Sequence, residues 1–178
     1  MTLLLFCFAL ANPSQQIKEE SVSKWINQTF EIVGHKVNYD VYLRSKDYDL
    51  RYVSEVLRVS SQITFNYISM SGMKTYCDRT DKLEVYGISF DELNKKTWIV
   101  QPELYPLLGN IYGLYDPNGK DVDLIWFTLL EPNTTHLPLA HEFAHFWYQK
   151  LCLEYNSSYV SSENFAKKIE ELYFNYWK

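Results

Sequence analysis

Residues 138–153 read PLAHEFAHFWYQKLCL, and this stretch decides how the rest of the chain is interpreted. Pro138 suits the first position of a helix, because the N–H that proline lacks has no helical partner there. The residues that follow are apolar on most sides of a helix, which is typical of a buried helix. The spacing predicts a helix from about Pro138 to Leu153, with a core-facing stripe formed by Ala140, Ala144, Trp147 and Leu151.

Within this helix lies His141-Glu142-Phe143-Ala144-His145, an H-E-x-x-H pattern. At about 100° per residue, a spacing of four brings the two imidazoles within about 40° of each other, one turn apart. Two nitrogens so placed can bind one Zn²⁺, and Glu142 can reach a zinc-bound water without being a ligand. Zinc would also satisfy polar groups that are costly to bury unpaired. The alternative is a pair of core histidines hydrogen-bonded to backbone.

The remaining elements are predicted from periodicity and turn residues. Alternation over Val37–Leu43 and the run Lys82–Ile88 predict strands, and helical spacing predicts an amphipathic helix over about 49–69. A short strand is expected at 98–100. Strands at 110–115 and 121–130 flank a Pro-Asn-Gly turn and predict a hairpin. A polar loop is expected at 131–136, and a last helix is expected to begin near Ser161 and Ser162, which are good N-caps.

This order of elements predicts an α+β fold. A mixed or antiparallel sheet would pack against a backing helix, residues 49–69, and against the helix that carries the motif. The chain has 178 residues, 47% of them hydrophobic and 22% charged, which is typical of one globular domain. The net charge is −5 and no Lys/Arg cluster is present, so nucleic acid is not expected as a partner.

The N-terminus carries an apolar run, LLLFCFALA at residues 3–11. The run is shorter than the roughly 20 residues of a membrane span, so no span is expected in the mature chain. It ends in Ala9-Leu10-Ala11, the small-x-small pattern of a signal-peptidase site. Residues 1–11 are therefore predicted to be a cleaved signal peptide, and residues 12–178 a single secreted or periplasmic domain. The alternative is a buried N-terminal strand or helix.

Cleavage after residue 11 would remove Cys7 and leave Cys77 and Cys152. An even number of cysteines in an exported protein allows one disulfide. Two unpaired buried thiols are the alternative, and the sequence leaves both open.

The motif at 141–145, together with Ser162-Glu163-Asn164-Phe165-Ala166, resembles the zincin metallopeptidases and, among them, the gluzincins. In that family a downstream helix supplies a glutamate as the third zinc ligand. The run from Glu163 is similar to the Glu-Gly-Phe-Ala segment of aminopeptidase-type gluzincins. It stands one residue closer to the motif than is usual there, and Asn164 replaces the glycine. The resemblance implies that Glu163 completes a zinc site with His141 and His145.

Three other glutamates follow the motif and compete for this role. Glu154 would lie about 13 Å along the helix from His145, too far to share an ion. Glu170 and Glu171 lie two turns further into the last helix, whose beginning is expected to face the metal.

The resemblance implies a zinc-dependent metallopeptidase of minimal zincin-like fold, with a zinc-activated water and Glu142 as general base. A peptide or protein substrate would pair in extended form with a sheet edge, for which residues 110–115 are the candidate. Larger gluzincins supply a Tyr or His to the transition state. Candidates here are Tyr159, Tyr173, Tyr176 and His136, and spacing does not choose among them. Two alternatives remain: a zincin-fold protein that binds zinc without turnover, acting as a binding or inhibitory module, and a metal-free structural domain.

Overall fold

The computed structural model describes residues 24–32, 34–44, 49–79, 82–100, 112–117, 122–128, 132–153 and 159–178. Within these residues the strands are β1 (Lys24–Ile32), β2 (His35–Leu43), β3 (Lys82–Ile88), β4 (Gly113–Asp116) and β5 (Asp123–Thr128). The helices are α2 (Leu50–Ser71), α3 (Phe90–Val100), α4 (Pro132–Lys150) and α5 (Tyr159–Tyr176). The predicted α+β class is confirmed. The predicted signal peptide, residues 1–11, lies outside the described residues and stays a prediction.

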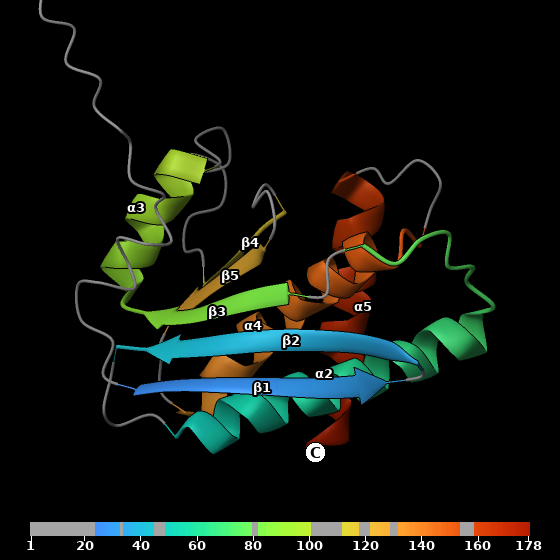
Figure 1. The fold of residues 1–178 in the computed structure, drawn as a ribbon, viewed down its shortest axis with the longest axis horizontal. Helices are drawn as coiled ribbons and strands as arrows, with labels where there is room; N and C mark the ends of the chain where they lie inside the picture. Colours follow the sequence, from blue (N-terminus) through green and yellow to red (C-terminus); the bar gives the residue numbers. More distant parts are fainter. Residues whose placement is uncertain are drawn as a thin grey trace, which may run out of the picture.

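The five strands form one mixed sheet in the order β1-β2-β3-β5-β4 (Figure 1). β1 and β2 are an antiparallel hairpin that turns at Gly34, whose φ of 81° suits glycine. β2, β3 and β5 are parallel, so crossover connections must join them, and α2 is the first. β4 pairs antiparallel with β5 at the end of the strand order. The predicted hairpin is thus confirmed in its described part, and β4 has no second partner among the described strands.

The helices α2, α4 and α5 pack together with the sheet around the main core (Figure 1). This core joins Val41, Val85 and Ile125 of the strands to side chains of all three helices. Trp147 of α4 is fully buried: its indole N–H donates to Ser61 Oγ of α2 at 3.1 Å, and its ring meets Phe65 edge-on. The prediction of a buried motif helix is confirmed.

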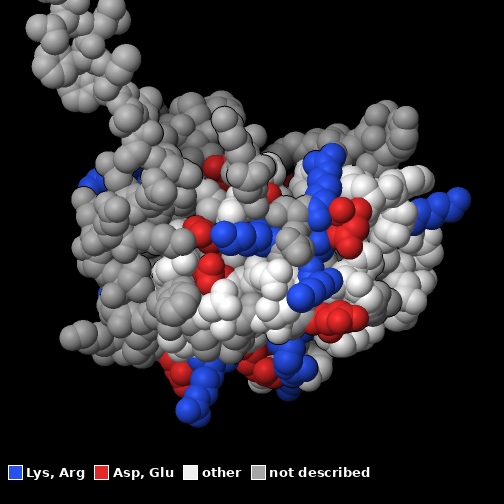
Figure 2. Space-filling view, in the orientation of Figure 1, with Lys and Arg blue, Asp and Glu red and all other residues white. Residues whose placement is uncertain are grey.

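The other face of the sheet carries a smaller apolar cluster. Tyr42 stacks on Tyr86, and Tyr86 stacks on Trp126, so one aromatic row crosses β2, β3 and β5. Leu93 of α3 joins this cluster. On the visible surface, described acidic and basic side chains lie interspersed (Figure 2). In the described part of the chain, every helix is too short or too polar to cross a membrane.

Two sequence predictions are wrong: the strand expected at the end of α3 and the loop expected where α4 begins. The expected strand at 98–100 is the end of α3, which a capping box begins: Ser89 N–H donates to Glu92 Oε2 at 3.1 Å, and Glu92 N–H donates to Ser89 Oγ at 3.4 Å. The expected polar loop at 131–136 is largely helical, because α4 begins at Pro132. Pro138 lies inside the helix, where its missing N–H removes one backbone hydrogen bond.

β1 and the start of α5 also differ from expectation. No strand was predicted over Lys24–Ile32, whose polar residues hide the alternation. α5 begins at Tyr159, so Ser161 and Ser162 lie inside the helix and are not N-caps. In α5, Phe165, Ile169 and Tyr173 are buried, whereas Tyr176 is exposed.

The end of α4 is held by a Schellman turn and a disulfide. Leu153 N–H donates to the Tyr148 carbonyl, and Cys152 N–H donates to the Gln149 carbonyl. Cys152 has a φ of 46°, in the left-handed region that favours glycine. Its sulfur is bonded to Cys77, so the structure has the disulfide and not two free thiols.

The residues around Cys77 clamp the same helix end. Arg79 N–H donates to the Lys150 carbonyl at 2.8 Å. The Lys150 side chain is 1% exposed, and its ammonium lies 2.6 Å from Asp78 Oδ1. Asp78 also contacts His35 Nδ1 at 3.1 Å. A buried lysine needs such a partner, because an unpaired buried charge is strongly destabilising.

Replacement of both cysteines by serine should lower the free energy of unfolding by about 3–4 kcal/mol, because the disulfide restrains the unfolded chain. Cys77→Ser combined with Cys152→Gly should lose about 1 kcal/mol less, since glycine adopts the left-handed conformation without a steric penalty. Urea unfolding of the three proteins measures both effects. Equal stability of the two double variants would contradict a steric cost at residue 152.

Candidate metal centre

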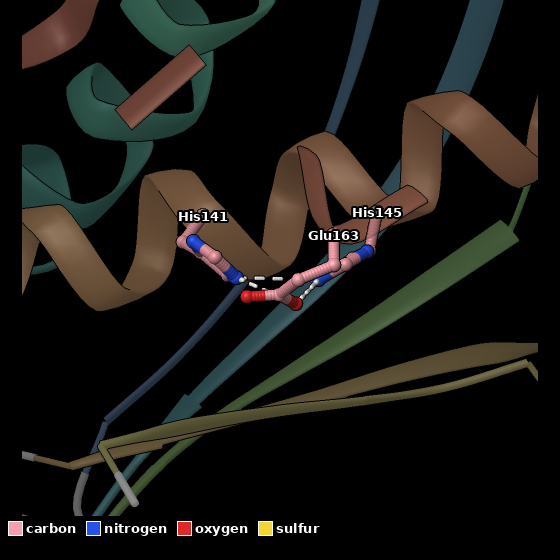
Figure 3. A group of neighbouring side chains, drawn as sticks. All are labelled: His141, His145 and Glu163. Atoms are coloured by element: carbon pink, nitrogen blue, oxygen red, sulfur yellow. Dashed lines mark hydrogen bonds and ion pairs between the residues drawn. The ribbon is translucent and has the colours of Figure 1, made fainter. Parts of the chain in front are cut away.

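His141 and His145 of α4 meet Glu163 of α5, and their three side chains converge (Figure 3). The two Nε2 atoms are 3.2 Å apart. Glu163 Oε2 lies 3.3 Å from Nε2 of His145 and 3.6 Å from Nε2 of His141. All three side chains are partly shielded from solvent, with 15%, 11% and 23% exposure for His141, His145 and Glu163. The structure thus brings together the three residues predicted as ligands.

These distances suit tetrahedral zinc. Zinc binds imidazole nitrogen at about 2.0–2.1 Å and carboxylate oxygen at about 2.0–2.2 Å, so ligand atoms of a tetrahedral site lie about 3.3–3.5 Å apart. The observed separations of 3.2, 3.3 and 3.6 Å bracket this range. One ion would therefore fit the three atoms with small side-chain adjustments. Two imidazoles and one carboxylate form the donor set of His₂Glu catalytic zinc sites, which keep a fourth position open.

The other nitrogen of each imidazole has its own partner on α5. His141 Nδ1 lies 2.9 Å from Glu170 Oε2, and His145 Nδ1 lies 2.7 Å from Ser162 Oγ. A carboxylate only accepts hydrogen bonds, so His141 donates to Glu170 through Nδ1. In the neutral ring, Nε2 then carries a lone pair that points toward His145 and Glu163. Metal-binding histidines commonly have such a partner, which fixes the ring and its tautomer.

Electrostatics in the group formed by His141, His145 and Glu163 favours a positive charge. Burial alone would lower the pKa of His141, but its contacts with the carboxylates of Glu163 and Glu170 raise that pKa to about 10. The two histidines in turn hold the pKa of Glu163 well below its usual range. The same negative surroundings that retain a proton on His141 would stabilise a metal cation, and proton and metal compete for these atoms.

Glu142, the predicted general base, lies beside the group and outside it. Burial raises the pKa of its carboxyl, and the charges of His145 and His141 oppose this. The backbone N–H of Tyr115, on β4, donates to the Glu142 carboxylate. Gly113, two residues earlier on the same strand, lies against the Glu142 side chain. An edge strand therefore holds the carboxylate that the sequence predicts to be catalytic.

Tyr115 also supports His145. The two rings are nearly parallel, with an interplanar angle of 3° and centroids 6.4 Å apart. The Tyr115 hydroxyl donates to Asp123 Oδ2 at 2.9 Å. Burial raises the pKa of Asp123 to about 6, even though this hydrogen bond opposes the shift. The ring that stacks on His145 is thus anchored at its far end by a buried carboxyl.

The other sequence candidates lie elsewhere or have other partners. Glu170 holds His141 Nδ1 and is not in the ligand group, and Glu171 is exposed and pairs with Lys168. The ring of His136 lies near Tyr173, which is buried in the core, and its Nδ1 contacts Tyr52. Tyr176 is 63% exposed. Glu154 and the side chain of Tyr159 lie outside what the structure describes.

Sequence reasoning did not anticipate the supporting residues Ser162, Glu170, Tyr115 and Gly113. One signal for Glu170 was present, because it follows Glu163 by seven residues, and that spacing returns to nearly the same helix face. No comparable signal marks Tyr115 or Gly113, because their role depends on how β4 lies against α4.

Comparisons with known proteins add no assignment. No protein-family model matches this sequence, and a search of curated proteins finds no significant match.

Zinc content measured by elemental mass spectrometry should be about one per chain, and should be lost in His145→Ala and in Glu163→Ala. Glu170→Gln should weaken zinc binding about 10- to 100-fold, because it replaces the charged acceptor that fixes His141 with a neutral amide. Glu171→Gln, an exposed change one residue along the same helix, is the matched control and should bind normally. Wild-type affinity in Glu163→Ala would rule out Glu163 as a ligand.

Asp123→Asn should stabilise the protein at pH 7–8. The pKa of Asp123 rises from 3.8 to about 6 on folding, so protonation favours the native state. The stability that the protonated carboxyl supplies is present below about pH 4 and is lost as the pH rises through about 6. The asparagine variant should exceed the wild type by up to about 3 kcal/mol at pH 7–8 and by little at pH 4. Thermal unfolding across this range measures the difference, and parallel pH profiles would contradict it.

Proposed function

We propose that this chain is a zinc-dependent metallopeptidase of the gluzincin type. The observation that carries the proposal is the convergence of Nε2 of His141, Nε2 of His145 and one oxygen of Glu163 at distances suited to one zinc ion. The resemblance of the motif and of the Glu163 segment to gluzincins supports the same activity. The partner on Nδ1 of each histidine supports a metal-binding role over a pair of core histidines.

Bound zinc would supply a Lewis acid that polarises the scissile carbonyl and makes water acidic near neutral pH. Glu142 would accept the proton of the attacking water and pass it to the leaving amine. The N–H of Tyr115 fixes this carboxylate, and a positioned base is more effective than a mobile one. Glu163 would remain a ligand through Oε2, because its other oxygen, Oε1, lies 3.2 Å from the Lys167 ammonium.

The edge strand β4 supports a peptide as the substrate. Thr128 N–H donates to the Tyr112 carbonyl at 2.9 Å, so Tyr112 faces β5. In an antiparallel pair such residues alternate with residues whose backbone groups face away. Gly113 and Tyr115 therefore direct their backbone groups to the outer edge, beside Glu142. A peptide in extended form could pair with the groups that remain, which is a general mode of peptide capture.

Export remains part of the proposal. The Cys77–Cys152 disulfide supports it, because disulfides persist in oxidising compartments such as the periplasm and the extracellular space. The predicted signal peptide at residues 1–11 is consistent with the same location.

Glu142→Gln should keep about one zinc per chain and lose peptide hydrolysis by at least about 100-fold, because the amide cannot accept the water proton. A quenched-fluorescence peptide library and zinc analysis on the same samples make the measurement. Glu171→Gln again serves as the control and should retain turnover. Zinc binding without cleavage in the wild type would favour a zinc-binding module without turnover, and absence of zinc would favour a metal-free domain.

A further inference from the structure

Gly113 of β4 occupies a position where any side chain would collide with Glu142. A Cβ built on Gly113 would lie 2.5 Å from Cγ, 2.8 Å from Oε1 and 3.0 Å from Cδ of Glu142. Real Cβ atoms essentially never approach heavy atoms this closely. Among the residues that the structure describes, chain neighbours aside, the three atoms nearest this position all belong to Glu142.

Backbone conformation does not explain this glycine. Gly34 and Gly72 have φ values of 81° and 64°, and a Cβ on either would meet nothing within 4 Å. These two glycines therefore serve turns or helix ends. Gly113 is the converse case: its φ lies outside the left-handed region, and it is crowded by one side chain. The backbone conformation at residue 113 would accept alanine, and the nearest obstacle to its Cβ is the Glu142 side chain.

A second contact from the same strand acts on the same carboxylate. Tyr115 N–H donates to the Glu142 carboxylate, and residues 113 and 115 direct their side-chain positions to the same face of the strand, toward α4. β4 thus contacts Glu142 at two positions: Glu142 occupies the space that a side chain on Gly113 would fill, and the Tyr115 N–H donates to its carboxylate. Together these contacts place the Glu142 carboxylate against the strand, between β4 and its own helix.

We propose that Gly113 is a positioning residue for Glu142: its missing side chain lets the carboxylate lie against the edge strand, within reach of the Tyr115 N–H and beside the His141–His145–Glu163 group. This role rests on the proposed function, in which Glu142 is the general base. The atoms nearest a Cβ on Gly113 all belong to Glu142 and none to His141, His145 or Glu163, so a side chain there should disturb the base and leave the metal in place.

The contact itself is tested by a cycle of thermal unfolding that needs no activity. Gly113→Ala should lower Tm by at least about 3 °C in the wild-type background. In a Glu142→Ala background the same change should leave Tm unchanged or raise it slightly, since the space is free and alanine restricts the unfolded chain. If Gly113→Ala fails to fold in the wild-type background but folds with Glu142→Ala, the coupling is equally established. Equal shifts in both backgrounds would overturn the proposal.

The catalytic consequence is tested on the zinc-loaded full chain. Gly113→Ala should lower kcat at least about 100-fold, because a displacement of about 1 Å is enough for such a loss. KM for a peptide substrate and the affinity for zinc should stay within about threefold of wild type. A merely structural defect would lower zinc binding and kcat together. A kcat within threefold of wild type would overturn the positioning role.

The two arms separate this proposal from the proposed function. If the zinc-loaded wild type cleaves no peptide, the peptidase proposal fails, and the thermal cycle alone decides whether Gly113 places Glu142. Coupling between the two sites would then support the placement, and its absence would overturn it.

Discussion

The packing of α4 against β4 is the constraint on which the candidate site depends. α4 cannot turn about its axis, because Trp147 is fixed to Ser61 and Phe65 of α2 on one side. On the other side, Tyr115 and Gly113 of β4 meet the motif. A rotation by one residue, about 100°, would move both imidazoles away from α5. The packing of apolar side chains thus determines the direction in which His141 and His145 point, so the geometry of the candidate site depends on the core.

α5 contributes Ser162, Glu163 and Glu170, which contact the two histidines, and its direction follows from these contacts. Ser162 and Glu163 meet His145, whereas Glu170 meets His141, so α5 runs antiparallel to α4 along the motif. The ligand and both supporting groups lie within two turns of one helix, about 11–12 Å of rise. The disulfide and the Lys150–Asp78 pair hold the end of α4, from which the chain proceeds to α5.

Local sequence signals predicted the parts of the fold that local forces determine. β3 matches its expected range of residues 82–88, and α2 lies within two residues of its expected range of 49–69, because periodicity and the Asp49 and Gly72 caps act within a few residues. The strand expected at 98–100 is wrong because the Ser89–Glu92 capping box begins a helix that continues through these three apolar residues. For the site, helical spacing placed the two histidines, and the resemblance to gluzincins identified Glu163. Gly113 and Tyr115 could not be predicted, since their partners are distant in sequence and depend on the sheet order.

The polar composition of the group is itself an argument for a cation. Glu142, Glu163 and Glu170 surround two imidazoles next to the apolar core, and paired or unpaired charges in such surroundings rarely add stability over apolar side chains of similar size. A fold under selection for stability alone would have little use for three carboxylates there. With both rings held by Nδ1 contacts, the facing Nε2 atoms, 3.2 Å apart, need a proton or a metal between them. A zinc ion would satisfy both nitrogens and Glu163 at once, whereas a proton would satisfy one pair.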